Sequence, residues 1–227
     1  MSETGIGAAV RRKEDQRFLT GRGTFTDDIN RPGQSYAAFV RSPHAHADIK
    51  SVNTKAAEAA DGVTAVLTGA DLSVDGIGGM PCGWGITSAN GEPMAEPAWP
   101  ILAADTVRYV GDSVAVAIAD TAAAAQAAAD KIVVDYDVLP AVVAPGDAPV
   151  AGAPQVHEAA ANNVCFDFEL GDKDATTAAF EAAHHVTTLN LVNQRPIPHA
   201  MEPRSAVAEF DRVRKTGRPC CRGTVQP

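Results

Sequence analysis

The sequence predicts an α+β fold, because a strand, a helix and a second strand follow one another twice within its first 140 residues. In the first unit, residues 47–68, an alternating segment and a β-branched segment flank a short helix at 55–60 that Thr54 can cap. In the second unit, residues 113–136, the alanine run 122–129 is the helix, since alanine has the highest helix propensity. We expect each helix to pack on one face of a sheet.

Local signals predict the other elements. Residues 11–28 are polar and turn-rich and form a lead-in. The segment 73–100 is rich in Gly and Pro and contains both tryptophans, and long loops of this kind are usually functional or interface-forming. The segment 144–154 (APGDAPVAGAP) indicates a linker and hence a domain boundary. We further predict strands at 35–41, 107–110, 164–170, 185–192 and 205–210 and a helix at 175–183.

The composition limits the class of protein. The chain has 227 residues, of which 45% are hydrophobic and only 5% aromatic, so alanine and valine dominate its predicted core. The net charge of −9 disfavours nucleic acid as a partner. No apolar run reaches the roughly 20 residues of a transmembrane helix, and the start lacks the pattern of a secretory signal. We therefore expect a cytoplasmic protein with reduced cysteines.

The last sixteen residues, 212–227, differ from the rest of the chain. They contain basic residues but no acidic one, and they hold Cys220 and Cys221 without any helical or strand periodicity. A natural basic tail is one interpretation. A shift of reading frame near Asp211 is the other, and we favour it for a reason given below. In either case we expect this tail to be disordered.

Histidines and cysteines are the first candidates for a site. On a strand, His44 and His46 would share a face and could bind a metal, but no third ligand stands at a recognisable spacing. His184 and His185 fall at a predicted helix end, where the helix dipole favours histidine. Cys82 has no evident cation or helix start to activate it, and adjacent cysteines such as Cys220 and Cys221 chelate poorly. A structural role is the favoured interpretation for each of them.

Other motifs also stop short of a site. The glycines at 76–79 lack the lysine and the helix of a phosphate-binding loop. Glu202 could act as a general base if it were buried beside a substrate. Its neighbours Pro203 and Arg204 favour a structural ion pair instead. From spacing alone, the chain is an α/β or α+β protein without an assigned function.

Several blocks of the sequence, in order, resemble one family. The chain is similar to the molybdenum-binding subunits of aerobic carbon monoxide dehydrogenase-like enzymes, which belong with xanthine dehydrogenase and aldehyde oxidase. Together the matching blocks extend over nearly all of residues 11–211. They are RRKED-RF-GRG-DD at 11–28, FVRSPHAHA at 39–47, GV-VLTG-DL at 62–72, VRYVG-VA at 107–115, VDY-LP at 134–140 and N-R-MEPR at 193–204.

The resemblance implies an organisation. Residues 1–143 would form an α/β hammerhead domain with its lead-in, 144–154 the linker, and 155–211 a truncated first molybdopterin-binding region, followed by the tail at 212–227. Family members continue with a glutamine near the molybdenum, a Gly-Gly-Gly-Phe-Gly segment, cofactor-binding loops and a catalytic glutamate. None of these occurs here, and the match fails after Asp211. A frameshifted or truncated gene product would explain both facts.

The resemblance also implies a function. Family enzymes oxidise carbon monoxide, or hydroxylate aldehydes or N-heterocycles with water-derived oxygen, on a molybdenum-molybdopterin cofactor of the cytosine dinucleotide type. They assemble with an FAD-binding medium subunit and an iron-sulfur small subunit. We expect this chain to be the amino-terminal part of such a large subunit, inactive and without cofactor when alone. We therefore assign no catalytic, cofactor-binding or metal-binding residue. The alternative is a non-catalytic binding or assembly module that docks on partner subunits.

Overall fold

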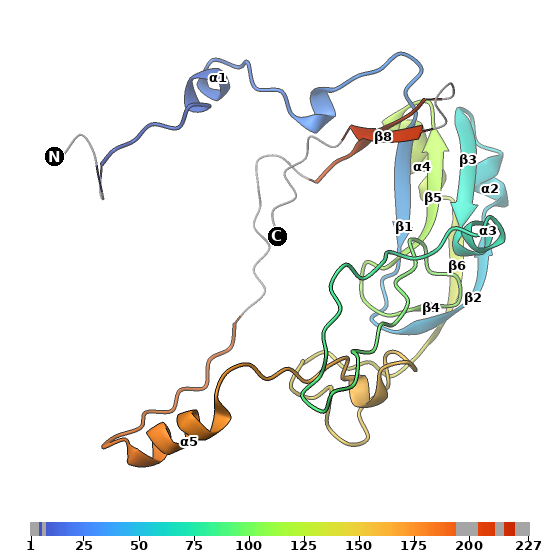
Figure 1. Cartoon of the computed structure of the whole chain (residues 1–227). Coiled ribbons are helices and arrows are strands. Elements are labelled where there is room, and N and C mark those ends of the chain that lie inside the picture. Colours follow the sequence, from blue (N-terminus) through green and yellow to red (C-terminus); the bar gives the residue numbers. More distant parts are fainter. Residues whose placement is uncertain (1–4, 6–7, 194–203, 212–215, 221–227) are drawn as a thin grey trace. The chain divides into compact units, whose positions relative to one another are not determined.

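A computed structural model describes residue 5 and residues 8–193, 204–211 and 216–220 of the chain. It divides into two compact units, one of residues 33–187 and one that contains the two ends of the chain (Figure 1). Each unit is described by itself. Within the described residues, no helix is both long enough and apolar enough to span a membrane.

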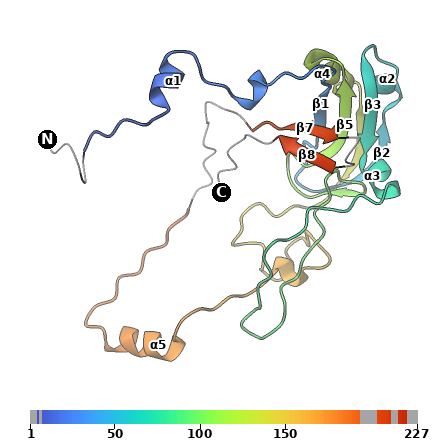
Figure 2. The same cartoon turned by 45° about the horizontal axis from the view of Figure 1, so that its top comes forward.

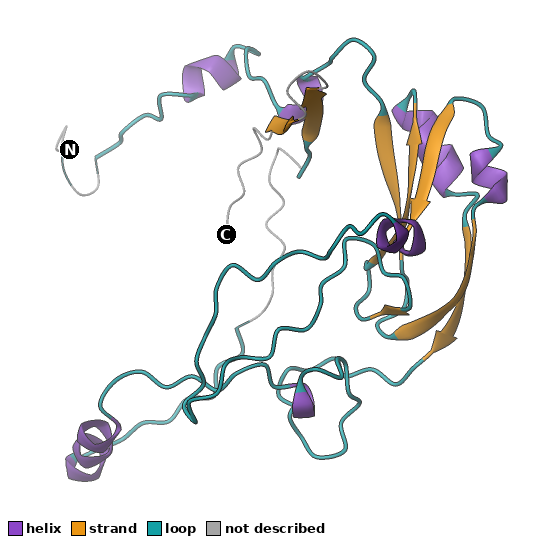
Figure 3. Ribbon diagram, turned by 45° about the vertical axis from the view of Figure 1, so that its right-hand side comes forward, coloured by secondary structure: helices purple, strands orange, loops and turns teal. Residues whose placement is uncertain are grey.

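The larger unit contains two three-stranded antiparallel sheets, which confirms the α+β class. The first sheet has the order β1 (Tyr36–Arg41), β5 (Ser113–Ala119), β3 (Val63–Thr68). The second has the order β4 (Thr106–Val107), β2 (Ala47–Asn53), β6 (Val133–Val138). Figure 3 shows the strands of both sheets in orange, with helices beside them.

Both strand–helix–strand units are present, but each shares its strands between the two sheets. The first runs from β2 through α2 (Lys55–Glu58) to β3, and the second from β5 through α4 (Ala122–Ala129) to β6. Strand β2 pairs with β6, and β3 pairs with β5, both antiparallel. The two strand–helix–strand units therefore pair with each other through both of their strands. Local sequence patterns do not specify this pairing.

Small side chains fill the space between α4 and the first sheet, as the composition predicts. Helix α4 lies against β1 and β5. The buried residues of this core are Ala57, Ala115, Ala117, Ala128, Ala129 and Ile132. Because alanine has no side chain beyond Cβ, the helix backbone can approach the sheet closely. A second core of Ala47, Ala103, Val107 and Val114 lies at the second sheet.

Two helices begin at threonine caps. The side chain of Thr68 accepts a hydrogen bond from the backbone N–H of Asp71 at the start of α3 (Gly69–Val74). Asp71 in turn accepts hydrogen bonds from the hydroxyl and the backbone N–H of Thr68, and these two bonds lower the pKa of its carboxyl group. At α4 the Thr121 hydroxyl accepts a hydrogen bond from Ala124 N at 3.1 Å. These caps satisfy N–H groups that have no partner within the helix.

We predict that Thr121→Ala lowers the free energy of unfolding by about 1 kcal/mol, the usual cost of losing an N-cap. Thr54→Ala is the matched control, because Thr54 precedes α2 but makes no capping hydrogen bond to its backbone. Its hydroxyl donates to the Glu58 side chain at the exposed surface instead. Urea denaturation of the two variants should show the larger loss for Thr121→Ala, and equal losses would contradict the prediction.

Some predicted strands are shorter or absent. The strand predicted at 107–110 reduces to β4, Thr106–Val107, because the chain turns at Tyr109, whose carbonyl accepts the N–H of Asp112 at 3.1 Å. The strands predicted at 164–170 and 185–192 are not formed. The helix predicted at 175–183 is α5 (Lys173–Ala182), which has no buried residue. Segment 164–170 accepts only single backbone hydrogen bonds from Ala89 and Ala95, and without a continuous ladder β-branched and aromatic residues do not make a strand.

The second unit includes the short helix α1 (Asp15–Leu19), the single turn η1 (Thr26–Asp28) and a hairpin of β7 (Val207–Asp211) with β8 (Thr216–Cys220). Figure 2 shows the two strands of the hairpin in red. The prediction that the tail from 212 has no regular structure is wrong for residues 216–220. Their pairing with β7 uses backbone groups, which need no side-chain periodicity. The remaining tail positions, 212–215 and 221–227, lie outside the described residues.

Candidate functional site

The histidine motif lies in a bend between β1 and β2, so its two rings do not share a strand face as they would if the motif were extended. The rings of His44 and Tyr136 make an edge-to-face contact, with centroids 5.0 Å apart and planes at 71°. His46 Nδ1 lies 2.9 Å from the carbonyl oxygen of Pro140. Among the described residues, no group of three or more His, Cys, Asp or Glu side chains could hold a metal ion. The two imidazoles thus have separate structural contacts.

A polar cluster lies beside this bend. The buried hydroxyl of Ser42 accepts the backbone N–H of His44 at 3.0 Å, and Ser42 also hydrogen-bonds to the Tyr136 side chain. Asp112 is only 7% exposed, and its carboxylate accepts the backbone N–H of Arg108 at 3.1 Å. Burial raises the pKa of Tyr136, the hydrogen bond to Ser42 lowers it, and the charge of Asp112 raises it further.

Arg108 connects this cluster to the segment that follows β6. Its Nε donates to the carbonyl oxygen of Val156 at 3.1 Å, and its terminal nitrogen donates to the carbonyl of Thr106 at 3.2 Å. His157 follows Val156 directly. Burial, and then the positive charge of Arg108 and the nearby His46, lower the pKa of His157, while Asp112 opposes the shift. The fold therefore favours the neutral form of this imidazole.

This shift predicts how stability changes with pH. Because the pKa of His157 is lower in the folded chain, the unfolded chain binds more protons between the two values. The contribution of neutral His157 to the free energy of unfolding is complete above pH 6.5, the ordinary pKa of histidine. It is lost as the pH falls through the lower pKa that His157 has in the folded chain. Urea denaturation between pH 7.5 and pH 5 should therefore show a smaller loss of stability for His157→Gln than for the wild type. If the stability of His157→Gln and of the wild type changed equally with pH, the prediction would be contradicted.

Asn163 organises the segment predicted as a linker. It lies at the end of the turn η2 (Ala161–Asn163) with φ of 57°, a left-handed conformation that asparagine tolerates. Its side-chain nitrogen donates to the carbonyl oxygens of Ala148 and Pro154 at 2.9 and 3.0 Å. Its side-chain oxygen accepts the N–H of Val156 at 2.8 Å. We call this arrangement of residues 148–163 the clasp.

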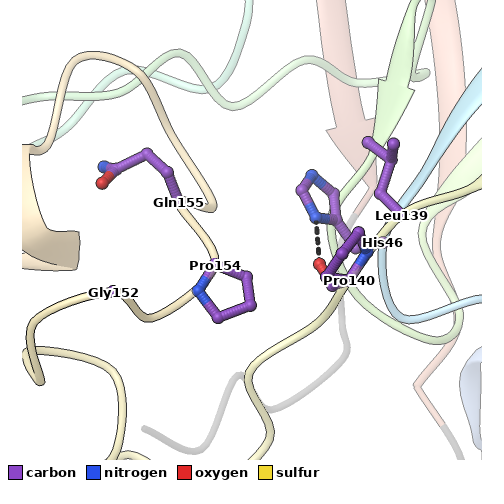
Figure 4. A pocket seen from close by; sticks show the side chains of 6 residues that line it. All are labelled: His46, Leu139, Pro140, Gly152, Pro154 and Gln155. Atoms are coloured by element: carbon purple, nitrogen blue, oxygen red, sulfur yellow. Dashed lines mark hydrogen bonds between the residues drawn. The ribbon is translucent and has the colours of Figure 1, made fainter.

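A shallow open depression of about 370 Å³ lies between the clasp and the end of β6. Figure 4 shows His46, Leu139 and Pro140 on one side and Gly152, Pro154 and Gln155 on the other. Its lining is mostly apolar, and the Gln155 amide nitrogen already donates to the carbonyls of His157 and Ala160. Its six lining residues do not pair a nucleophile with a base.

The other candidates from the sequence stay apart from one another. Cys82 is exposed, and its sulfur contacts the carbonyl of Trp84 at 3.3 Å. His185 is exposed and lies 3.1 Å from the hydroxyl of Thr187. The glycines at 76–79 belong to the loop after α3. Glu202, Cys221 and the side chain of Cys220 lie outside the described part of the structure.

Sequence patterns did not single out Arg108, Asp112 or Asn163. Arg108 and Asp112 flank a turn, and their side chains bind backbone groups, of which Val156 is distant in the sequence and Thr106 and Arg108 are near. Asn163 had a usable signal, since two adjacent asparagines between turn residues can indicate a left-handed backbone. All three side chains bind backbone groups and so hold the backbone in place.

Comparison with known proteins identifies the family. The family model described as "Aldehyde oxidase and xanthine dehydrogenase, a/b hammerhead domain" matches residues 20–140, more than half of the chain. The chain therefore belongs to the aldehyde oxidase and xanthine dehydrogenase family, and the resemblance seen in its sequence is confirmed.

Individual relatives extend the match. The chain is 34% identical over 222 residues to the carbon monoxide dehydrogenase large chain of Afipia carboxidovorans, covering 92% of this chain and 26% of that one. It is 36% identical to the nicotine 6-hydroxylase large subunit of Paenarthrobacter nicotinovorans, covering 91% and 24%. The solved CO dehydrogenase from Oligotropha carboxidovorans superposes with a TM-score of 0.64 at 34% identity, covering 80% and 23%. The chain thus spans about a quarter of the length of these relatives.

The cofactor of the family can be tested against the residues present. One relative is a molybdenum-binding subunit of xanthine dehydrogenase, from Escherichia coli O157:H7. In the described part of this chain, the buried polar groups are Thr26, Ser42 and Asp112, and Ser42 and Asp112 are hydrogen-bonded within the chain. They form no cradle for a pterin and no ligand set for a metal. These buried polar groups therefore do not fit the cofactor by themselves.

Proposed function

We propose that this chain is the amino-terminal part of the molybdopterin-binding large subunit of a molybdenum hydroxylase. The observation that carries the proposal is the match of more than nine tenths of the chain to about a quarter of the length of such large chains. In this proposal residues 1–143 are the hammerhead domain, 144–154 the linker and 155–211 the start of the first molybdopterin-binding region. The substrate is carbon monoxide, an aldehyde or an N-heterocycle.

The cofactor, the partners and the compartment belong to the same proposal. Molybdenum with molybdopterin cytosine dinucleotide would be held by the parts of the large subunit that this chain does not span, and it would supply the redox chemistry when bound. An FAD-binding subunit and an iron-sulfur subunit would complete the complex, in the cytoplasm. The names of two relatives, a "large chain" and a "large subunit", support a complex of several subunits. The contribution of this chain would be to fold the hammerhead domain against the rest of the large subunit.

A chimera tests this proposal. Residues 1–211 of this chain would replace the matching part of the Afipia carboxidovorans large chain, which would be produced with its own partner subunits. We expect the chimera to assemble, to contain molybdenum in amounts close to those of the parent enzyme and to oxidise carbon monoxide. A chimera that folds and assembles but holds no molybdenum would contradict the proposed function.

A further inference from the structure

Asn90 and Gly91 are the only Asn-Gly pair of the sequence, and they lie at the tip of a short hairpin in the loop between α3 and β4. A hydrogen bond from Ser88 N to the carbonyl oxygen of Glu92 at 2.8 Å joins the two arms of this hairpin. Gly91 has a φ of 86°, the left-handed conformation that closes three-residue hairpin loops. Both Asn90 and Gly91 are exposed. Figure 1 shows this loop in green, extending away from the two sheets.

The side chain of Asn90 is folded back onto the backbone that follows it. Its Oδ1 accepts the backbone N–H of Glu92 at 3.0 Å. This hydrogen bond closes a small ring that contains both the amide carbon of Asn90 and the backbone nitrogen of Gly91, so it keeps these two atoms near each other. A backbone N–H at the amide oxygen also stabilises the negative charge that develops there when a nucleophile attacks the amide carbon.

Gly91 leaves its own nitrogen accessible. Glycine has no Cβ, and nothing lies within 4 Å of the point where a Cβ at this position would stand. The N–H of Gly91 donates to the carbonyl oxygen of Ser88 at 2.8 Å, and this hydrogen bond must break before the nitrogen can attack. A single hydrogen bond contributes only about 1 kcal/mol net, so at an exposed loop tip it opens often.

We propose that Asn90 is a site of spontaneous deamidation, with water as its co-reactant. The nitrogen of Gly91 loses its proton and bonds to the amide carbon of Asn90. The side-chain nitrogen takes up a proton and leaves as ammonia. Water then opens the five-membered succinimide ring at either carbonyl, which gives isoaspartate or aspartate. An amide and water become a carboxylic acid and ammonia, without a change of oxidation state.

Two other asparagines of the chain serve as internal controls. Asn30 and Asn162 are exposed, as Asn90 is. They are followed by Arg31 and Asn163, whose side chains obstruct attack by the backbone nitrogen, whereas glycine has no side chain at all. The proposal therefore places the modification at Asn90 and not at exposed asparagines in general.

The experiment incubates the full-length chain in its folded state at physiological temperature. Mass spectrometry of its peptides follows each asparagine over time, and an isoaspartyl-specific methyltransferase detects isoaspartate. The test variant is Gly91→Asn, because asparagine tolerates the left-handed backbone but places a Cβ beside the attacking nitrogen. Asn30→Gln is the control variant, since it removes an exposed asparagine elsewhere in the chain. Circular dichroism checks that both variants remain folded.

We expect Asn90 of the wild type to be converted at least about tenfold faster than Asn30 or Asn162, a difference of about 1.4 kcal/mol in the barrier. Gly91→Asn should slow the conversion of Asn90 by a similar factor, and Asn30→Gln should leave it unchanged. The rate should rise from neutral to mildly alkaline pH, because the attacking nitrogen must lose its proton.

Equal rates at the three asparagines would overturn the inference. So would a folded chain in which Asn90 stays intact while the same chain in urea is converted, because the hairpin would then protect the site. Neither outcome depends on the proposed function, which the chimera tests separately.

Discussion

Gly69→Ala is expected to lower the free energy of unfolding by about 2 kcal/mol net. Gly69 is buried at the start of α3. A Cβ atom there would lie 2.6 Å from the carbonyl oxygen of Ala103 and 2.7 Å from the Cα of Ala104, both backbone atoms. Overpacking costs about 1–3 kcal/mol, and rigid backbone partners place this site at the upper end. The gain in helix propensity, at most about 1 kcal/mol, does not offset it.

Gly78→Ala is the matched control for this substitution. A Cβ atom at Gly78 would meet nothing within 4 Å, and its backbone is not left-handed. Gly78→Ala should therefore leave the free energy of unfolding unchanged or raise it by up to about 1 kcal/mol, because alanine lowers the conformational entropy of the unfolded chain. Urea denaturation of the two variants beside the wild type measures the difference. If both variants were equally stable, the close approach of 69 to 103–104 would not exist in solution.

The elements that sequence patterns predict well are those with a strong local signal. Strand β2 begins at 47, β3 ends at 68, β5 begins at 113 and α4 covers 122–129, as the two predicted strand–helix–strand units require. In each of them the alternation, the β-branched residues or the alanine run agree with the core that later buries them. The prediction failed at 164–170 and 185–192, where aromatic and β-branched residues suggested strands that find no sheet to join. Pairing is a long-range property, and nothing within these segments encodes a partner.

The same limit applies to the candidate site. The histidines attracted attention because imidazole is a common ligand, yet His44 and His46 contact an aromatic ring and a carbonyl oxygen. Sequence patterns do not indicate Arg108 and Asn163, because their side chains bind backbone groups. Backbone groups occur at every position of every sequence, so such a contact requires no particular residue type in the partner. Side chains that hold a loop in place leave no spacing motif, while side chains that bind metals do. The family, in contrast, could be predicted because its blocks of residues occur in order along the chain.

Asn163→Ala is expected to open the clasp. The side chain makes three hydrogen bonds to backbone groups of residues 148–156. At about 1 kcal/mol each, reduced where water replaces the lost partner, their loss costs about 2 kcal/mol of local stability. This corresponds to roughly a 30-fold larger open fraction. Proteolysis of a transiently opened segment follows that fraction, so cleavage within 144–156 should accelerate by a similar factor.

Asn162→Ala distinguishes the effect of the lost hydrogen bonds on cleavage from the effect of the left-handed backbone conformation. Asn162 has φ of 53°, close to the 57° of Asn163, so alanine loses the same tolerance for the left-handed region at either position. The side chain of Asn162 is exposed. Limited proteolysis with a protease of broad specificity, followed by mass spectrometry, should show fast cleavage in the clasp for Asn163→Ala only. If Asn162→Ala were cleaved as fast, backbone strain would control the clasp. If neither variant differed from the wild type, residues 144–154 would be the open linker that their composition predicts.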